Sequence, residues 1–218
     1  VAGGLGPGVK VGDVVVAGAF LQHDLDASPL FPRHEVPLYG RARFATDAGW
    51  TSRLARAARQ ALPGAGFHQG LIVSGDRFVS TTSEAKALQR ELPEALAVEM
   101  EGAAIAQVCL DFGVPFGVVR SISDRADDDA HVDFMQFVAE VASPHAVAMV
   151  DSVLQHLSPA DTPVPPSTLP VASVCVTAPP ASVTTLVSFL AFGSFVPEPS
   201  TVMVSVDVLG ASSVSCIL

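Results

Sequence analysis

Apolar segments rich in β-branched residues alternate with amphipathic segments over the first 157 residues, and this alternation limits the possible folds more than any other feature. Strands are expected at 9–20, 70–76, 95–100 and 115–124, and helices at about 47–62, 82–92, 101–113 and 132–157. Strands that are continuously apolar are typical of a sheet covered by helices on both faces. The sequence therefore predicts a layered α/β fold. The inner face of its last helix is expected to contain Phe134, Phe137, Val138, Val141, Val147, Val150, Val153 and Leu154.

The charge balance excludes several classes of partner. The chain has 12 basic and 22 acidic residues and a net charge of −10, which argues against nucleic acid or an anionic membrane surface. No apolar run reaches the roughly 18 residues of a membrane span. No Cys or His residues stand at the spacing of a zinc site, and we expect neither metal nor cofactor.

The first residues give a further expectation about location. They contain no Met, no basic stretch and no apolar stretch, so we expect no signal peptide and a cytoplasmic protein. Three widely spaced cysteines form no closed disulfide framework, which also favours a reducing compartment. The Gly-rich opening, VAGGLGPGVKVGD, suggests that upstream sequence is absent.

Composition changes sharply near Ser158. Residues 158–218 contain no Lys or Arg, only three acidic residues, and 9 of the 17 prolines. The stretch 158–170 is typical of an extended Pro-rich linker, and the apolar runs after it lack the turn residues of a hairpin. We therefore expect one domain at 1–157 and a tail at 158–218 that is disordered or artefactual and lies outside the functional fold.

Polar groups follow three of the predicted strands. They lie in SGDRF (74–78), in VEMEG (98–102) and in RSISD (120–124), which the acidic stretch RADDDAH follows. Ligands of α/β proteins gather where strands end and loops begin, so these acids, one Arg and one aromatic residue indicate a site for a flat, polar ligand.

Each of these segments also has a purely structural interpretation. Asp76 could cap a turn. Glu99 and Glu101 flank a helix start, where the helix dipole stabilises carboxylates whatever their function. Asp127–Asp129 are typical of a solvated helix entrance rather than a metal site.

Taken together, the segments IVSGDRF, AVEMEGAAIAQVC and VPFGVVRSISDRAD resemble the 5′-methylthioadenosine/S-adenosylhomocysteine nucleosidases of the nucleoside phosphorylase superfamily. The resemblance covers about residues 2–157. It implies a three-layer α/β/α fold with a mixed central sheet, the C-terminal two thirds of the family domain. It also implies hydrolysis of an N-glycosidic bond with release of adenine, in methionine salvage.

The resemblance implies a role for each matching residue. Asp124 would protonate the adenine N7, oriented by Ser123, with Arg120 near the attacking water. Asp124 must then hold a proton near neutral pH, which burial and acidic neighbours favour. Substrate binding would fall to the purine-stacking Phe78, the backbone of Val79, the carboxylates Glu99 and Glu101, the sugar-packing Met100 and the alkylthio-pocket residue Phe134.

The segment 21–40 contains three prolines and resembles the part of each subunit that reaches into its partner's site. Leu30, Phe31 and Pro37 are the candidate lid residues. The expected partners are therefore a small adenine nucleoside and a second copy of the chain in a homodimer.

The resemblance is incomplete at the N-terminus. The family carries further residues before AGGL, which form its first strands and hold the glutamate that acts as general base. Nothing here replaces that glutamate, so we expect this chain to be impaired. The alternatives are a related purine nucleoside phosphorylase or aminofutalosine nucleosidase, and a non-catalytic remnant or interaction module.

Overall fold

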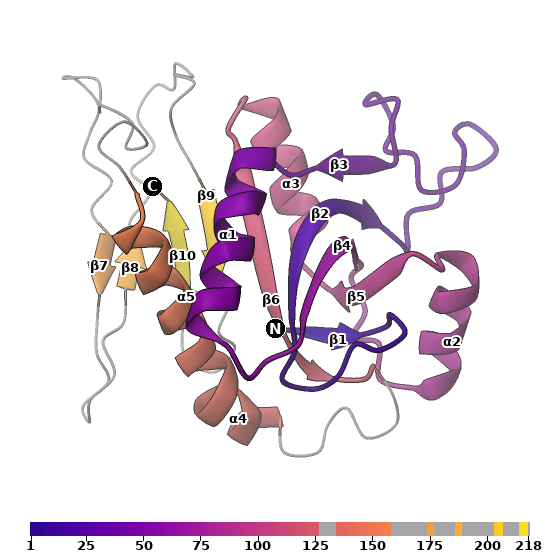
Figure 1. Ribbon diagram of the computed structural model, residues 1–218. Helices are drawn as coiled ribbons and strands as arrows, with labels where there is room; N and C mark the ends of the chain where they lie inside the picture. Colours follow the sequence, from indigo (N-terminus) through magenta and orange to yellow (C-terminus); the bar gives the residue numbers. More distant parts are fainter. Residues whose placement is uncertain (127–133, 158–173, 177–185, 189–202, 207–213, 218) are drawn as a thin grey trace.

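The computed structural model describes residues 1–126 and 134–157, together with the backbone of four short strands beyond them. Figure 1 shows helices α1 and α5 side by side on one side of the strands and α2 on the opposite side. The described elements are β1 (Ala2–Gly4), β2 (Val14–Gln22), β3 (Arg43–Ala45), α1 (Ala48–Ala61), β4 (Phe67–Ser74), α2 (Thr82–Glu91), β5 (Ala95–Glu99), α3 (Gly102–Asp111), β6 (Phe116–Asp124), α4 (Phe134–Phe137), a π-helical turn (Val138–Ala142), α5 (Ser143–Gln155), β7 (Val174–Val176), β8 (Leu186–Ser188), β9 (Met203–Val206) and β10 (Val214–Ile217).

Five of the strands close into a ring. The pairing runs β6–β1–β5–β4–β2 and returns from β2 to β6, while β3 extends the sheet beyond β2. β2, β4 and β5 are mutually parallel, whereas β6 is antiparallel to β2. The mixed sheet with flanking helices that the sequence predicts is confirmed, and its closure into a ring is an addition to that prediction.

Alternate residues of β2 face different helices. Val15 and Ala17 belong to a core that includes α3, whereas Val14 and Val16 pack in a second core with α1 and α5. A third core lies under α2. Because both faces of β2 are covered, its apolar residues are continuous rather than alternating.

Helices α1 and α2 begin at side-chain caps. The Asp47 carboxylate accepts from Trp50 N at 2.8 Å at the start of α1. The Thr81 hydroxyl accepts from Glu84 N at 3.3 Å at the start of α2. Such caps satisfy backbone N–H groups that have no partner inside the helix.

The helix over residues 134–155 contains a π-helical turn just before Pro144. The Val138 carbonyl accepts from the Ser143 backbone N–H, the i→i+5 bond of a π-turn, and also from the Ser143 hydroxyl at 2.8 Å. The inner face predicted for this helix is confirmed at Val138 and Val153, which are buried. It is wrong at Val147 and Leu154, which are exposed beside the buried stripe that contains Ala146, Met149 and Val153.

This helix, Phe134–Gln155, has 22 residues and a mean hydropathy of 1.3 over its most apolar stretch, enough by length and composition for a membrane span. Its buried face nevertheless packs with α1 in the second core, as the core helix of a globular domain does.

The strands beyond residue 157 are short. β7 pairs with β8 and β10 with β9, and β9 runs parallel to the first residues of β6. The boundary at residue 158 and the disorder expected for 158–218 concern residues that lie mostly outside the described part of the chain, so both stay predictions.

Candidate active site

The ends of β5 and β6 flank the same residue of β1. Gly3 pairs with Val98 on one side and with Asp124 on the other. Two strand spacings, about 10 Å, therefore separate Val98 from Asp124. β1 is antiparallel to β5 and parallel to β6, so β5 and β6 run in opposite directions. The short strand β1, and not a shared parallel edge, brings these two predicted segments together.

Asp124 is buried against β1 and the turn that follows β6. Its Oδ2 accepts from the Ser123 hydroxyl at 2.7 Å, and its Oδ1 accepts from Ala126 N at 2.7 Å. A side chain on Gly3 would place its Cβ 2.9 Å from Asp124 Oδ1, so only glycine leaves room there. Each carboxylate oxygen retains a second lone pair that can carry a proton or meet a ligand. The predicted pairing of Ser123 with Asp124 is present.

Arg120 lies in the protein interior and joins two carboxylates. Its side chain is 0% exposed and forms an ion pair with Glu99, which is 2% exposed. The same Nη2 also lies 3.4 Å from Oε2 of Glu101, whose side chain is 47% exposed. Buried charges are tolerated only when they are paired and hydrogen-bonded. Arg120 therefore links a buried carboxylate to one that reaches solvent.

Glu99 holds the start of α3. Its Oε1 and Oε2 accept from Gly102 N at 3.0 and 2.9 Å, and Oε2 also accepts from Glu101 N at 3.3 Å. The Ser74 hydroxyl, at the end of β4, donates to Glu99 as well and accepts from Ala103 N at 2.8 Å. The contacts described for Glu99 are all to protein groups, so the structural interpretation fits this residue.

Glu101 differs from its neighbour. It occupies the N-cap position of α3, but its carboxylate makes no capping hydrogen bond. Half-exposed and oriented by Arg120, this carboxylate is available to a ligand. We call Ser74, Glu99, Glu101, Arg120, Ser123 and Asp124 the strand-end cluster.

Apolar side chains next to the cluster in sequence are unusually exposed. Phe78 is 46% and Met100 42% exposed, whereas Val79 is buried. Phe134, predicted to line the alkylthio pocket, is partly buried at the start of α4. An exposed aromatic ring near carboxylates suits a ligand with one flat apolar face. Asp127–Asp129 lie outside the described residues.

The predicted lid residues differ in exposure. Leu30 is 84% exposed, and Phe31 and Pro37 are partly buried. The segment is tied to the end of α2, because His34 Nε2 lies 3.1 Å from Oε1 of Glu91.

Sequence reasoning missed Asp24. Its Oδ2 accepts from Asp76 N at 2.7 Å, at the start of the loop that carries Phe78 and Val79. An acidic residue directly after a strand was the only signal available, and its partner lies 52 residues away. This bond also shows why Asp76 is fixed at its turn, through its backbone rather than as a cap.

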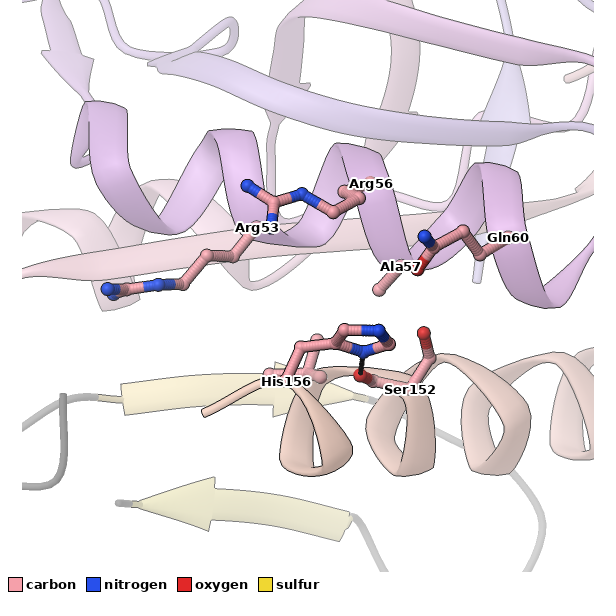
Figure 2. Close-up of a pocket in the computed structure, with 7 residues that line it drawn as sticks. Arg53, Arg56, Ala57, Gln60, Ser152 and His156 are labelled. Atoms are coloured by element: carbon pink, nitrogen blue, oxygen red, sulfur yellow. Dashed lines mark hydrogen bonds between the residues drawn. The ribbon is translucent and has the colours of Figure 1, made fainter. Parts of the chain in front are cut away.

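A separate hollow lies away from the cluster. A cavity of about 180 Å³ between α1 and α5, the α1–α5 cavity, is lined by Arg53, Arg56, Ala57, Gln60, Ser152, Val153 and His156. Figure 2 shows that the guanidinium groups of Arg53 and Arg56 do not converge with the imidazole of His156 on one point. Among residues 1–126 and 134–157, no group of three potential metal ligands gathers.

Known proteins match both this sequence and this fold. The model of the family described as the phosphorylase superfamily matches residues 1–155. A 5′-methylthioadenosine/S-adenosylhomocysteine nucleosidase from Exiguobacterium is 41% identical over 160 residues, which are 73% of this chain and 67% of the relative.

Solved structures agree. The nucleosidase of the same description from Neisseria meningitidis, crystallised with methylthio-immucillin-A, is 42% identical with a TM-score of 0.66, over 72% of this chain and 67% of that one. The futalosine hydrolase of Helicobacter pylori is 35% identical with a TM-score of 0.64, over 72% and 66%. The chain thus spans about two thirds of the length of these relatives. The matches in sequence and fold, together with the strand-end cluster, lead to one conclusion: the chain belongs to the phosphorylase superfamily and, within it, to the 5′-methylthioadenosine/S-adenosylhomocysteine nucleosidase family.

Proposed function

We propose that the protein hydrolyses the N-glycosidic bond of 5′-methylthioadenosine and S-adenosylhomocysteine and releases adenine. The observation that carries this proposal is the strand-end cluster, in which a buried acid, Asp124, lies across β1 from Val98, and the solvent-reaching carboxylate Glu101 follows three residues after Val98. The similarity to nucleosidases at about 40% identity supports the reaction class.

Asp124 is the general acid in this proposal. Adenine leaves readily only when N7 carries a proton, and a carboxylic acid held by Ser123 and by the Ala126 amide is suited to deliver it. General acid catalysis contributes about 10²–10⁴-fold to the rate. Breaking the bond returns the electron pair to N9 of the protonated base and leaves Asp124 as a carboxylate. Water adds to C1′ of the sugar cation and loses a proton to solvent, because the general base implied by the family resemblance has no counterpart in this chain, and we therefore propose that turnover is slow.

Glu101 acts on the sugar. Its carboxylate accepts hydrogen bonds from the ribose hydroxyls and stabilises the positive charge that develops on the ring as the base departs. Phe78 stacks on the purine, the Val79 backbone binds the purine edge, and Met100 and Phe134 pack on the sugar and its 5′-substituent.

The charge balance favours water over phosphate as the nucleophile. Among the residues described as buried, Arg120 is the only Lys or Arg, and Glu99 and Glu101 both pair with it. Asp124 adds a third carboxylate to the cluster, and the buried residues described here include no second Lys or Arg. A phosphate anion needs cationic donors that are not already neutralised. Hydrolysis is therefore preferred to phosphorolysis.

A futalosine hydrolase is the second candidate, since one such structure is 35% identical to this chain. It would use the same acid and the same sugar carboxylate, so the difference lies in the 5′-substituent. Comparing turnover of methylthioadenosine with that of futalosine separates the two.

We also infer a homodimer that acts in methionine salvage in the cytoplasm. Leu30 and Leu38, both in the segment between β2 and β3, are 84% and 98% exposed. Large apolar side chains that are this exposed suit a protein interface. Sedimentation of the protein, with Leu30→Asp as the disrupting variant, tests the dimer.

Incubation with methylthioadenosine tests the reaction. The proposal expects free adenine and free methylthioribose, formed slowly because the general base is absent, whether or not phosphate is present. Methylthioribose 1-phosphate formed only with phosphate would identify a phosphorylase. A chain that neither binds methylthioadenosine in calorimetry nor releases adenine would favour the interaction module.

A further inference from the structure

From the contacts at the end of β4, we infer that Asp24 is a positioning residue for the loop 75–79, the loop assigned above to adenine. That the ligand is adenine rests on the proposed function. The contacts that hold the loop do not depend on it. Asp24 lies in the turn directly after β2 and touches neither Asp124 nor Glu101 in the described contacts.

The backbone after β4 is held from both sides. The β2–β4 ladder continues one residue beyond β2, because His23 N donates to the Ser74 carbonyl at 2.8 Å. On the other side, Gly75 N donates to the Glu99 carbonyl at 3.1 Å. The next amide, Asp76 N, donates to the Asp24 carboxylate at 2.7 Å. A side chain thus continues the ladder where backbone pairing stops.

The fit around Gly75 is tight. A Cβ at this position would lie 2.4 Å from His23 Nε2 and 3.0 Å from Asp24 Cγ. His23 is itself buried, and its Nε2 has no hydrogen-bond partner in the described part of the chain. The ring therefore acts as a wedge that, with the Asp24 carboxylate, fixes where the loop leaves β4.

The loop has a second fixed point at the start of α2. The Thr81 hydroxyl donates to Oε2 of Glu84 at 2.8 Å and caps the helix. Phe78 and Val79 thus lie on a short span between the held Asp76 amide and the Thr81 cap. Freeing the Asp76 amide lengthens this span, and the loop must then be ordered again each time the purine binds.

Three variants test this assignment. Asp24→Ala removes the acceptor, whereas Asp24→Asn keeps a carbonyl oxygen at the same place. Asp26→Ala is the matched control, because Asp26 accepts from Ser28 N at 3.0 Å in the same segment but makes no contact with the loop. The measurements are the dissociation constant for adenine by calorimetry, amide exchange of the 75–79 backbone, and the melting temperature.

We expect Asp24→Ala to weaken adenine binding about three- to tenfold, the factor that one net hydrogen bond supplies, and to speed exchange of the Asp76 amide. Because the bond lies at the surface, the melting temperature should fall no more than in Asp26→Ala. Asp24→Asn should restore most of both losses.

Unchanged adenine binding and unchanged Asp76 exchange in Asp24→Ala would overturn the assignment. An equal loss of binding in Asp26→Ala would also overturn it, because the effect of Asp24→Ala would then be a general effect on the segment 21–40. Wild-type protein that does not bind adenine would contradict the proposed function instead, and the exchange of the Asp76 amide would then decide the positioning role alone.

Discussion

The strand-end cluster and the α1–α5 cavity both gather polar and charged side chains, but they differ in what holds those side chains. In the cluster, Arg120 and Glu99 are almost fully buried and are fixed by each other and by backbone amides. In the cavity, Arg56 and Gln60 are exposed on one helix face, and His156 donates from Nδ1 to the Ser152 carbonyl at 2.6 Å, within its own helix.

The difference teaches that enclosure alone does not identify a site. The cavity is a hollow of about 180 Å³, but its polar groups pair locally, because Arg53 lies over the Trp50 ring and His156 bonds within its own helix. In the cluster, a buried ion pair and backbone amides hold the charged groups in place. Catalysis depends on preorganised groups rather than on volume.

The largest expected effect comes from Asp124. Asp124→Asn keeps the shape of the side chain but removes the acidic proton, so adenine release should fall about 10²–10⁴-fold. His156→Asn in the cavity should leave the rate unchanged. Both variants are compared by adenine release under single-turnover conditions. A rate for Asp124→Asn above about a tenth of the wild-type value would mean that another group protonates the base.

The second-largest expected effect is the loss of stability when the buried cation is removed. Arg120→Met leaves the Glu99 carboxylate buried without its ion pair, and breaking such pairs costs about 3–5 kcal/mol of unfolding free energy. Arg56→Met, the same exchange at an exposed position, should change stability by less than about 0.5 kcal/mol. Urea denaturation measures both, and equal losses would erase the distinction between the two regions.

Glu101→Gln tests a carboxylate that contacts ligand rather than core. We expect methylthioadenosine to bind about tenfold more weakly, as when a hydrogen bond to a charged group is lost, with little change in stability. Gln60→Glu, which places a new carboxylate in the α1–α5 cavity, should not alter binding. Should Glu101→Gln bind normally, the ribose site would have to be sought elsewhere.

The smallest expected effect is a loss of stability at low pH. Burial lowers the pKa of His23 below its ordinary value of 6.5, against an opposing contribution from Asp24. The unfolded chain therefore binds a proton at this residue at a higher pH than the folded chain does, and the free energy of unfolding should fall as pH drops below about 6.5. In His23→Asn this decline should be smaller, whereas His156→Asn should keep it. Melting temperatures at pH 7.5 and pH 5.5 are the measurement.

Much of the fold was predictable because its strands are buried on both faces. Runs such as Val14–Val16 and Ile72–Val73 are continuously apolar for that reason, and the polar groups after them stand out. The motifs around Glu101 and Asp124 were accessible for the same reason.

The features of the fold and site that the sequence did not predict depend mostly on contacts between residues far apart in the chain. The ring closes through a three-residue strand, Ala2–Gly4, which is too short to have a pattern of its own. The bond from Asp76 to Asp24 joins two loops, and no local signal marks it. The error at Val147 has another source, since Val147 and Leu154 adjoin the buried stripe of Ala146, Met149 and Val153, and apolar spacing alone does not separate a stripe from its edge.

The closed ring of strands also affects how the molecule opens. A strand at the end of an open sheet can separate by breaking one ladder, but each of the five ring strands is held along both sides. β3 pairs only with β2 among the described strands, so it can detach while the ring stays intact. The ring should therefore behave as a single cooperative unit that opens only with the whole domain. Asp124, Glu99 and Arg120 all lie on that unit, so thermal fluctuations that loosen the periphery leave their relative positions unchanged.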